Sequence, residues 1–193
     1  MASSTEICNT ALILIGQEPV ITLDDTSKQA RLCKRLYDSV LEAILRQYPW
    51  TFAIRRTILS RDLEIPVFGK AYQYTLPTDC LRIIDICVTA DDRDCISDSE
   101  YTVEGNKILT DYEPLYLRYI SRPKSANLFD PQFCTCLAYR LARVMCQALT
   151  ADQDLLVKLT ELETQAIQLA QHTQAIEQSP QKVKEGQWIK SRW

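Results

Sequence analysis

The chain of 193 residues is poor in the residues on which most catalytic and cofactor sites depend. It has four glycines, which provide no glycine-rich loop to cradle a phosphate. Its single histidine, His172, lies in a glutamine-rich stretch with no acidic residue one helical turn away, so no Ser-His-Asp or Cys-His arrangement is indicated. Cys134 and Cys136 lack the Cys-x-x-Cys spacing of a zinc site. We therefore expect no enzyme, no cofactor and no metal site.

Long apolar runs and strong charge of one sign are also missing. The run from Ala11 to Ile15 is too short to cross a bilayer, and residues 1–10 lack the basic and apolar regions of a secretory signal. We expect no membrane association, and we expect the eight cysteines to be reduced, small core residues of a protein made in a cytosol. The net charge of −3 argues against a broadly basic surface that binds nucleic acid.

Helical periodicity dominates the N-terminal quarter of the chain. Residues 5–16 form a predicted short helix that Gly16 ends, and Asp24 or Asp25 offers an N-cap to a longer helix over residues 26–47. One side of that helix is apolar, with Cys33, Leu36, Tyr37, Val40, Leu41, Ile44 and Leu45. The other side carries Lys28, Arg31, Lys34, Arg35 and Arg46, which is either a solvated face or a contact for an acidic or phosphate-bearing partner.

A junction follows at Tyr48–Arg56. Pro49 disfavours helical geometry at Tyr48, and beyond it Trp50 and Phe52 alternate with smaller or polar residues, which predicts a strand. We expect both aromatic side chains to act as a structural junction that orients a β domain on the helices. Residues 50–120 then read as strands, including a hairpin at Val103–Ile108 whose turn is Gly105-Asn106.

Helical periodicity returns at Asp130, a good N-cap that precedes Pro131 at the first helical position. A last helix begins at Thr150 or Asp152. It contains a heptad-like seam, which either packs within the chain or contacts a neighbouring subunit; the seam comprises Leu155, Leu159, Leu162, Ala166, Leu169, Thr173 and Ile176.

The end of the chain changes in character. Residues 179–193 are polar and basic and contain two tryptophans, which suggests a docking tail rather than a frayed terminus. The candidate partner-binding residues are Lys182, Lys184, Trp188, Ile189, Lys190, Arg192 and Trp193. The predicted fold class is α+β: a helical bundle from residues 1–48 and 126–178, an inserted antiparallel β domain over 49–125, and an extended C-terminal tail over 179–193.

An ordered series of short phrases resembles the tail tubular protein A family of short-tailed bacteriophages. The phrases include Asn9-x-Ala11-Leu12-x-x-Ile15-Gly16, Asp24-Asp25-x-Ser27-Lys28-x-Ala30-Arg31-Leu32-Cys33, Leu45-Arg46-x-x-Pro49-Trp50-x-Phe52-Ala53-x-Arg55-Arg56, Phe68-Gly69-x-Ala71-Tyr72-x-Tyr74-x-Leu76-Pro77-x-Asp79-Cys80-Leu81-Arg82 and Leu128-Phe129-Asp130-Pro131-x-Phe133. The resemblance covers residues 6–150 in detail, and the tail after Ser179 matches no pattern of the family.

This resemblance implies a structural virion protein, the head-to-tail adaptor or gatekeeper. It implies a homo-oligomeric ring of twelve copies at the portal vertex, between the portal protein and a tail nozzle of the tail tubular protein B type. DNA would pass through the lumen without sequence-specific binding, during genome retention and ejection. The protein would be made in the host cytoplasm and reside in the virion tail.

Two other classes remain open from the residues alone. A helical nucleic-acid-binding module would use the basic face of the helix over 26–47. A thiol enzyme would use one of the eight cysteines, which would then need an unusually low pKa.

Overall fold

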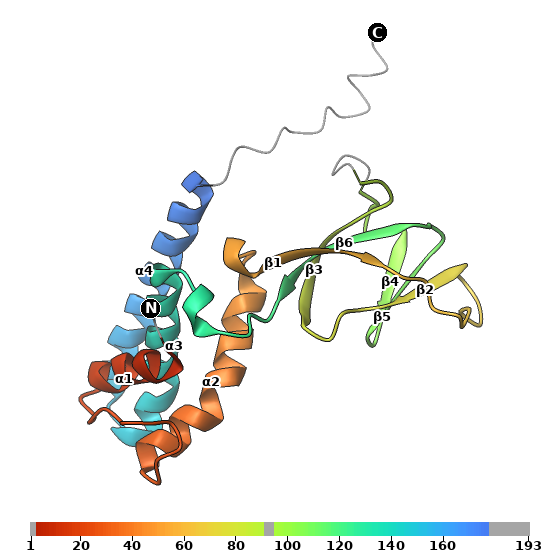
Figure 1. The fold of residues 1–193 in the computed structure, drawn as a ribbon. Coiled ribbons are helices and arrows are strands. Elements are labelled where there is room, and N and C mark those ends of the chain that lie inside the picture. Colours follow the sequence, from red (N-terminus) through yellow and green to blue (C-terminus); the bar gives the residue numbers. More distant parts are fainter. Residues whose placement is uncertain (1–2, 91–94, 178–193) are drawn as a thin grey trace. The chain divides into compact units, whose positions relative to one another are not determined.

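The computed structural model describes residues 3–90 and 95–177, and its elements are labelled in Figure 1. These residues form an α+β fold, as predicted. The helices are α1 (Ser4–Leu14), α2 (Lys28–Gln47), α3 (Pro131–Leu149) and α4 (Gln153–Glu177), with short 3₁₀ helices at Thr51–Ala53 and Ala126–Leu128. The strands are β1 (Ile54–Leu59), β2 (Tyr72–Thr75), β3 (Cys80–Cys87), β4 (Tyr101–Glu104), β5 (Lys107–Thr110) and β6 (Leu115–Ser121). The predicted tail over 179–193 lies outside the described residues.

The chain divides into two compact units. The helical unit combines Met1–Ile54 with Ile120–Ala175, and the β unit contains Arg55–Tyr119. The sequence-based boundaries, 48 and 126, differ from these by six residues at each side because the 3₁₀ turn and the end of β6 belong to the helical unit.

Local signals account for the start of each of the first three helices. Ser3 and Glu6 form a reciprocal capping box at α1, and Asp130 accepts hydrogen bonds from the Gln132 and Phe133 amides at α3. At α2 the predicted caps Asp24 and Asp25 are wrong. The helix begins at Lys28, and the side chain of Ser27 accepts a hydrogen bond from the Ala30 amide.

Helix α3 forms the centre of the helical core. Both α1 and α2 pack against it, and its fully buried side chains include Phe133, Leu137 and Leu141. The apolar side of α2 is buried as predicted, except that Leu36 is half-buried. The loop between α1 and α2 is fixed by Asn9, whose side-chain amide donates to the Val20 carbonyl at 2.9 Å and accepts from the Val20 amide at 2.8 Å.

The predicted strand at Trp50 and Phe52 is wrong. Residues 51–53 form a 3₁₀ turn, and β1 begins only at Ile54. Trp50 is 1% exposed, donates its indole N–H to the Ile44 carbonyl at 3.1 Å, and stacks edge-on against Phe133 with 4.9 Å between ring centroids. Phe52 contacts Phe129 and Phe133, also in the helical unit. The two rings are therefore part of the helical core, and their effect on the orientation of the β unit stays a prediction.

The β unit contains two small antiparallel sheets, with strand orders β1-β6-β3 and β2-β5-β4. The predicted hairpin is confirmed: β4 and β5 pair with Val103 opposite Ile108, and Gly105 turns the chain at a φ of +60°. A buried core centred on Tyr74, Ile108 and Leu117 joins the strands.

The expectation that all cysteines are reduced is wrong for one pair. Cys87 ends β3 and lies directly opposite Cys95 in an antiparallel bridge, where the two form a disulfide. The six other cysteines are free: Cys8, Cys33, Cys80, Cys134, Cys136 and Cys146. Because pairing in this bridge depends on how the chain turns between the two residues, the sequence spacing alone did not indicate it.

Candidate functional site

The described residues contain no cluster of three or more His, Cys, Asp or Glu side chains that could hold a metal ion. His172 is exposed on α4. Burial raises the pKa of the Cys134 thiol, and it raises the pKa of the Cys136 thiol to about 11. Both thiols are therefore protonated at neutral pH, which makes them poor nucleophiles. None of the helices in ranges 3–90 and 95–177 combines the length and the hydropathy that a bilayer crossing requires.

The basic face of α2 is partly engaged within the helical unit. Lys28 donates to the Ala148 carbonyl at 3.0 Å, and Lys34 pairs with Asp24 at 2.6 Å. Arg31 and Arg35 are exposed. Lys28 and Lys34, which could contact an acidic partner, are thus already held by groups of this chain.

The most informative departure from the sequence pattern is on α4. Of the predicted seam, only Leu159 is buried, at 2% exposure, whereas Leu162, Leu169 and Ile176 are 40%, 61% and 71% exposed. The face of α4 that is buried instead carries Leu159, Glu163, Ala170 and Gln174. Of the two alternatives for the seam, packing within the chain holds for Leu159 and does not hold for Leu162, Leu169 and Ile176, for which contact with a neighbouring subunit stays a prediction.

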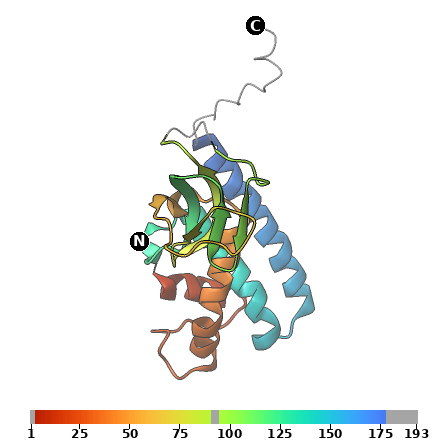
Figure 2. The same ribbon diagram turned by 90° about the vertical axis from the view of Figure 1, so that its right-hand side faces the viewer.

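Polar side chains fasten the inward face of α4. Glu163 is 5% exposed; one carboxylate oxygen accepts from Arg140 and the other accepts from Arg143 Nε at 2.5 Å. Nearer the C-terminal end, Gln174 donates to the Thr51 hydroxyl at 2.9 Å. Both views draw α4 alongside α3, and the turned view shows its full length (Figure 2). These contacts fix which side of α4 faces the bundle and which side faces outward.

The outward side of α4 presents what we call the α4 apolar row: Leu155, Leu162, Leu169 and Ile176. The seven-residue spacing aligns these side chains along the helix with a drift of only about 20° per heptad. Leu155 is half-buried and the other three are exposed. Exposed apolar side chains that line up on one side of a helix form a candidate interaction surface for another chain.

A second exposed apolar surface lies between β1 and β2. In the β1–β2 loop, residues 60–71, four side chains point into solvent: Leu63 at 102%, Ile65 at 75%, Val67 at 97% and Phe68 at 88% exposure. No other stretch of the described chain exposes so many large apolar side chains within six residues. The sequence alone did not indicate this loop, because Leu63, Ile65 and Val67 alternate with Glu64 and Pro66 as they would in a strand.

The N-terminal end of the β1–β2 loop is held by ion pairs. Lys107 contacts the carboxylates of Asp62 at 3.2 Å and Glu64 at 3.6 Å, and Asp62 also accepts from the Thr75 hydroxyl. Arg61 pairs with Glu113 at 3.1 Å. These contacts anchor the loop to the β unit and neutralise the charges that flank its apolar tip.

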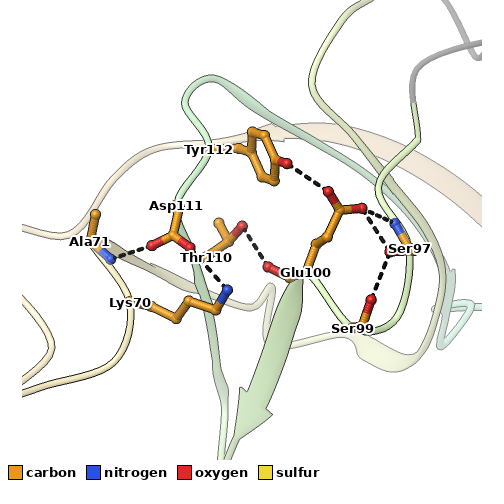
Figure 3. A network of polar contacts seen from close by, with 8 residues as sticks. All are labelled: Lys70, Ala71, Ser97, Ser99, Glu100, Thr110, Asp111 and Tyr112. Carbon is orange, nitrogen blue, oxygen red and sulfur yellow. Dashed lines mark hydrogen bonds and ion pairs between the residues drawn. The ribbon is translucent and has the colours of Figure 1, made fainter.

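The C-terminal end of the β1–β2 loop is held by the network of polar contacts in Figure 3. Asp111 accepts from both the Lys70 ammonium and the Ala71 amide at 2.9 Å. Nearby, Glu100 accepts from the Tyr112 hydroxyl at 2.6 Å and from the Ser97 amide at 2.7 Å. The hydrogen bond from Tyr112, followed by that from the Ser97 amide, lowers the pKa of Glu100 to about 2. The network is structural, because its carboxylates are satisfied by groups of the chain itself.

The helical unit also contains a polar pocket of about 410 Å³, which lies by the start of α1 and the segment that follows β6. Two cations line it, Arg122 and the exposed Lys124. Arg122 is already bound by Asp38 at 2.6 Å and Glu42 at 2.9 Å, so one of the two cations is held by groups of the helical unit.

The predicted partner-binding residues of the tail, Lys182 to Trp193, lie outside the described residues. Trp50 and Phe52, the predicted structural junction, are packed in the helical core. The chain matches no protein-family model, and no curated protein sequence matches it at a significant level. The two exposed apolar surfaces, one on α4 and one on the β1–β2 loop, are the candidate functional sites.

Proposed function

We propose that the chain is a structural virion protein, a ring-forming head-to-tail adaptor that joins a portal protein to a tail nozzle and lines the DNA channel. The observation that carries the proposal is the α4 apolar row. A subunit of a ring must bury part of its surface against its neighbours, and Leu162, Leu169 and Ile176 lie exposed on a helix whose inward face is fixed by the contacts of Glu163. The resemblance to the tail tubular protein A family supplies the identity of the ring.

One further observation supports the proposal. The chain has a net charge of −3, which suits a channel through which DNA slides, because a surface that binds phosphates would oppose translocation.

The test is assembly on the cognate portal protein. Purified chain and portal are mixed, and the particle is examined by electron microscopy and native mass spectrometry. We expect a twelvefold ring of this chain beneath the portal. A chain that stays monomeric in the presence of portal, or a particle without rotational symmetry, would refute the proposal.

The matched variants place equal charge on two sides of α4. Leu162→Lys with Leu169→Lys changes the α4 apolar row, whereas Thr160→Lys with Thr164→Lys adds the same charge to exposed positions on the other side of the helix. We expect the first variant to lose ring formation and the second to retain it. Equal assembly by both would show that the row is not a subunit contact.

A further inference from the structure

The β1–β2 loop is a preformed apolar projection. Its tip exposes Leu63, Val67 and Phe68 almost fully, and both of its ends are held to the rest of the β unit by ion pairs and hydrogen bonds. Because the loop is already ordered, docking it costs less conformational entropy than docking a flexible segment. Exposed apolar groups on a braced loop are typical of an interaction site rather than of a solvent-exposed turn.

The charges beside the tip decide which chemistry the loop can recognise. Arg61, Asp62 and Lys70 are each paired with an opposite charge of the β unit. The tip therefore offers apolar contact with little free charge, which does not suit nucleic acid or an anionic surface. An apolar, uncharged protein surface is the matching partner.

The chain itself carries such a surface. The α4 apolar row consists of leucine and isoleucine, and the exposed side chains between and beside its members include Lys158, Glu161, Gln165 and Gln168, which together carry no net charge. A repeating ring needs two different surfaces on each subunit, because the same patch meeting itself closes the assembly at a dimer. The loop and the row are two unlike apolar surfaces of one chain, and pairing them buries both.

We propose that the β1–β2 loop of one copy of this chain docks on the α4 apolar row of the next copy. The inference rests on the proposed ring, for which it names the two surfaces that would join neighbouring copies. It places a head-to-tail contact between a β unit and the helical unit of a second molecule. The contact is apolar, so its strength should depend little on salt concentration.

The experiment uses two complementary variants of the full-length chain. Val67→Asp inactivates the loop and Leu169→Asp inactivates the row, and both positions are exposed enough for the substitutions to leave each unit folded. The matched controls are Ser60→Asp at the start of the loop and Thr164→Asp on the side of α4 away from the row, both at exposed positions. Sedimentation velocity over a concentration series measures self-association of each protein and of mixtures.

The wild type and both controls should associate with increasing concentration. Each inactivated variant alone should associate roughly ten- to hundredfold more weakly, the effect of losing one buried apolar side chain. The equimolar mixture of Val67→Asp and Leu169→Asp should recover a dimer with one copy of each and nothing larger. This is expected because the intact loop of one variant meets the intact row of the other, while the remaining two surfaces are both inactivated.

Three outcomes would overturn the inference: a monomeric mixture, normal association of Val67→Asp while Leu169→Asp fails, and a wild type that stays monomeric at every concentration. The second would indicate that the row pairs with itself. Binding of the wild type to neutral phosphatidylcholine vesicles, lost in Val67→Asp, would assign the loop to a lipid surface and would also overturn it. Twelvefold particles formed on the portal by Val67→Asp would reject this docking and leave the proposed adaptor function standing.

Discussion

Glu163 is the residue on which the position of α4 depends most, and its replacement by glutamine is the sharpest stability test. Its carboxylate lies between the guanidinium groups of Arg140 and Arg143, and the three side chains are 7%, 15% and 34% exposed. Glu163→Gln keeps the shape of the side chain and removes its charge. Two cations of the helical unit then face a neutral amide that carries a single acceptor oxygen.

The expected loss follows from burial. Removing one partner of a buried ion pair costs roughly 3–5 kcal/mol, because the charge that remains is uncompensated. Arg143 is a third exposed and is partly solvated, so its share falls toward the surface range of about 0–1 kcal/mol. Arg140 also donates to Gln47, which retains one of its hydrogen bonds. We therefore expect the free energy of unfolding to fall by about 3 kcal/mol.

The assay is urea unfolding of the full-length chain followed by far-ultraviolet circular dichroism. Glu161→Gln is the control, because Glu161 is exposed on the same helix and its replacement removes the same charge. We expect Glu163→Gln to unfold at a clearly lower urea concentration than Glu161→Gln, with a similar dependence on urea. If the two variants differ by less than about 0.5 kcal/mol, the typical range for surface substitutions, the bridge does not hold α4 and the reasoning fails.

Three further predictions concern other parts of the two units. Trp50→Ala should lower the free energy of unfolding by about 3–5 kcal/mol, since a large buried side chain is lost. Circular dichroism in native buffer and the assembly assay then show whether assembly of the subunit ring fails before the secondary structure does. The pKa of Glu100 lies below its ordinary value, so its stabilisation of the β unit is full above about pH 4.5 and is lost toward pH 2, and Glu100→Gln should flatten this acid dependence in unfolding measurements. Asn9→Ala should speed hydrogen exchange of the Val20 amide and lower the free energy of unfolding by about 1–3 kcal/mol. Unchanged exchange would show that Asn9 does not fix the loop between α1 and α2.

Much of the helical unit was predictable because its signals are local. Asp130 followed by Pro131 marks the start of α3, and the spacing of apolar residues in α2 identifies its buried side. The 3₁₀ turn at residues 51–53 was not predictable in the same way. Alternation over so few residues also fits a turn, and Phe129 and Phe133, which hold the Trp50 and Phe52 rings, lie about eighty residues further along the chain.

The candidate surfaces were harder to predict for a different reason. A heptad pattern states that a row of side chains will be buried, but it does not say whether the partner helix belongs to the same chain. The inward face of α4 contains Glu163 and Gln174, whose partners Arg140, Arg143 and Thr51 lie elsewhere in the sequence. Without those partners both residues read as solvent-exposed, and the apolar row was the natural choice for the inner face.

The exposure of leucines and the burial of a carboxylate on α4 are together an argument for a partner. Leu162 and Leu169 are 40% and 61% exposed, so a helix that buried both in its own bundle would gain, for each, roughly half of the 1.5–3 kcal/mol that full burial of a leucine contributes. The chain instead buries a carboxylate, which is tolerated only because two arginines on α3 surround it. This arrangement holds the leucines outward in a defined direction, as a subunit contact requires. Replacing Arg140, Arg143 and Glu163 together by Met, Met and Leu puts an apolar contact in place of the ion pairs on the same face of α4. The chain should therefore stay folded with the leucines still outward, and assembly should be retained. Loss of assembly with unchanged stability would show that the ion pairs orient α4 in a way that apolar packing does not.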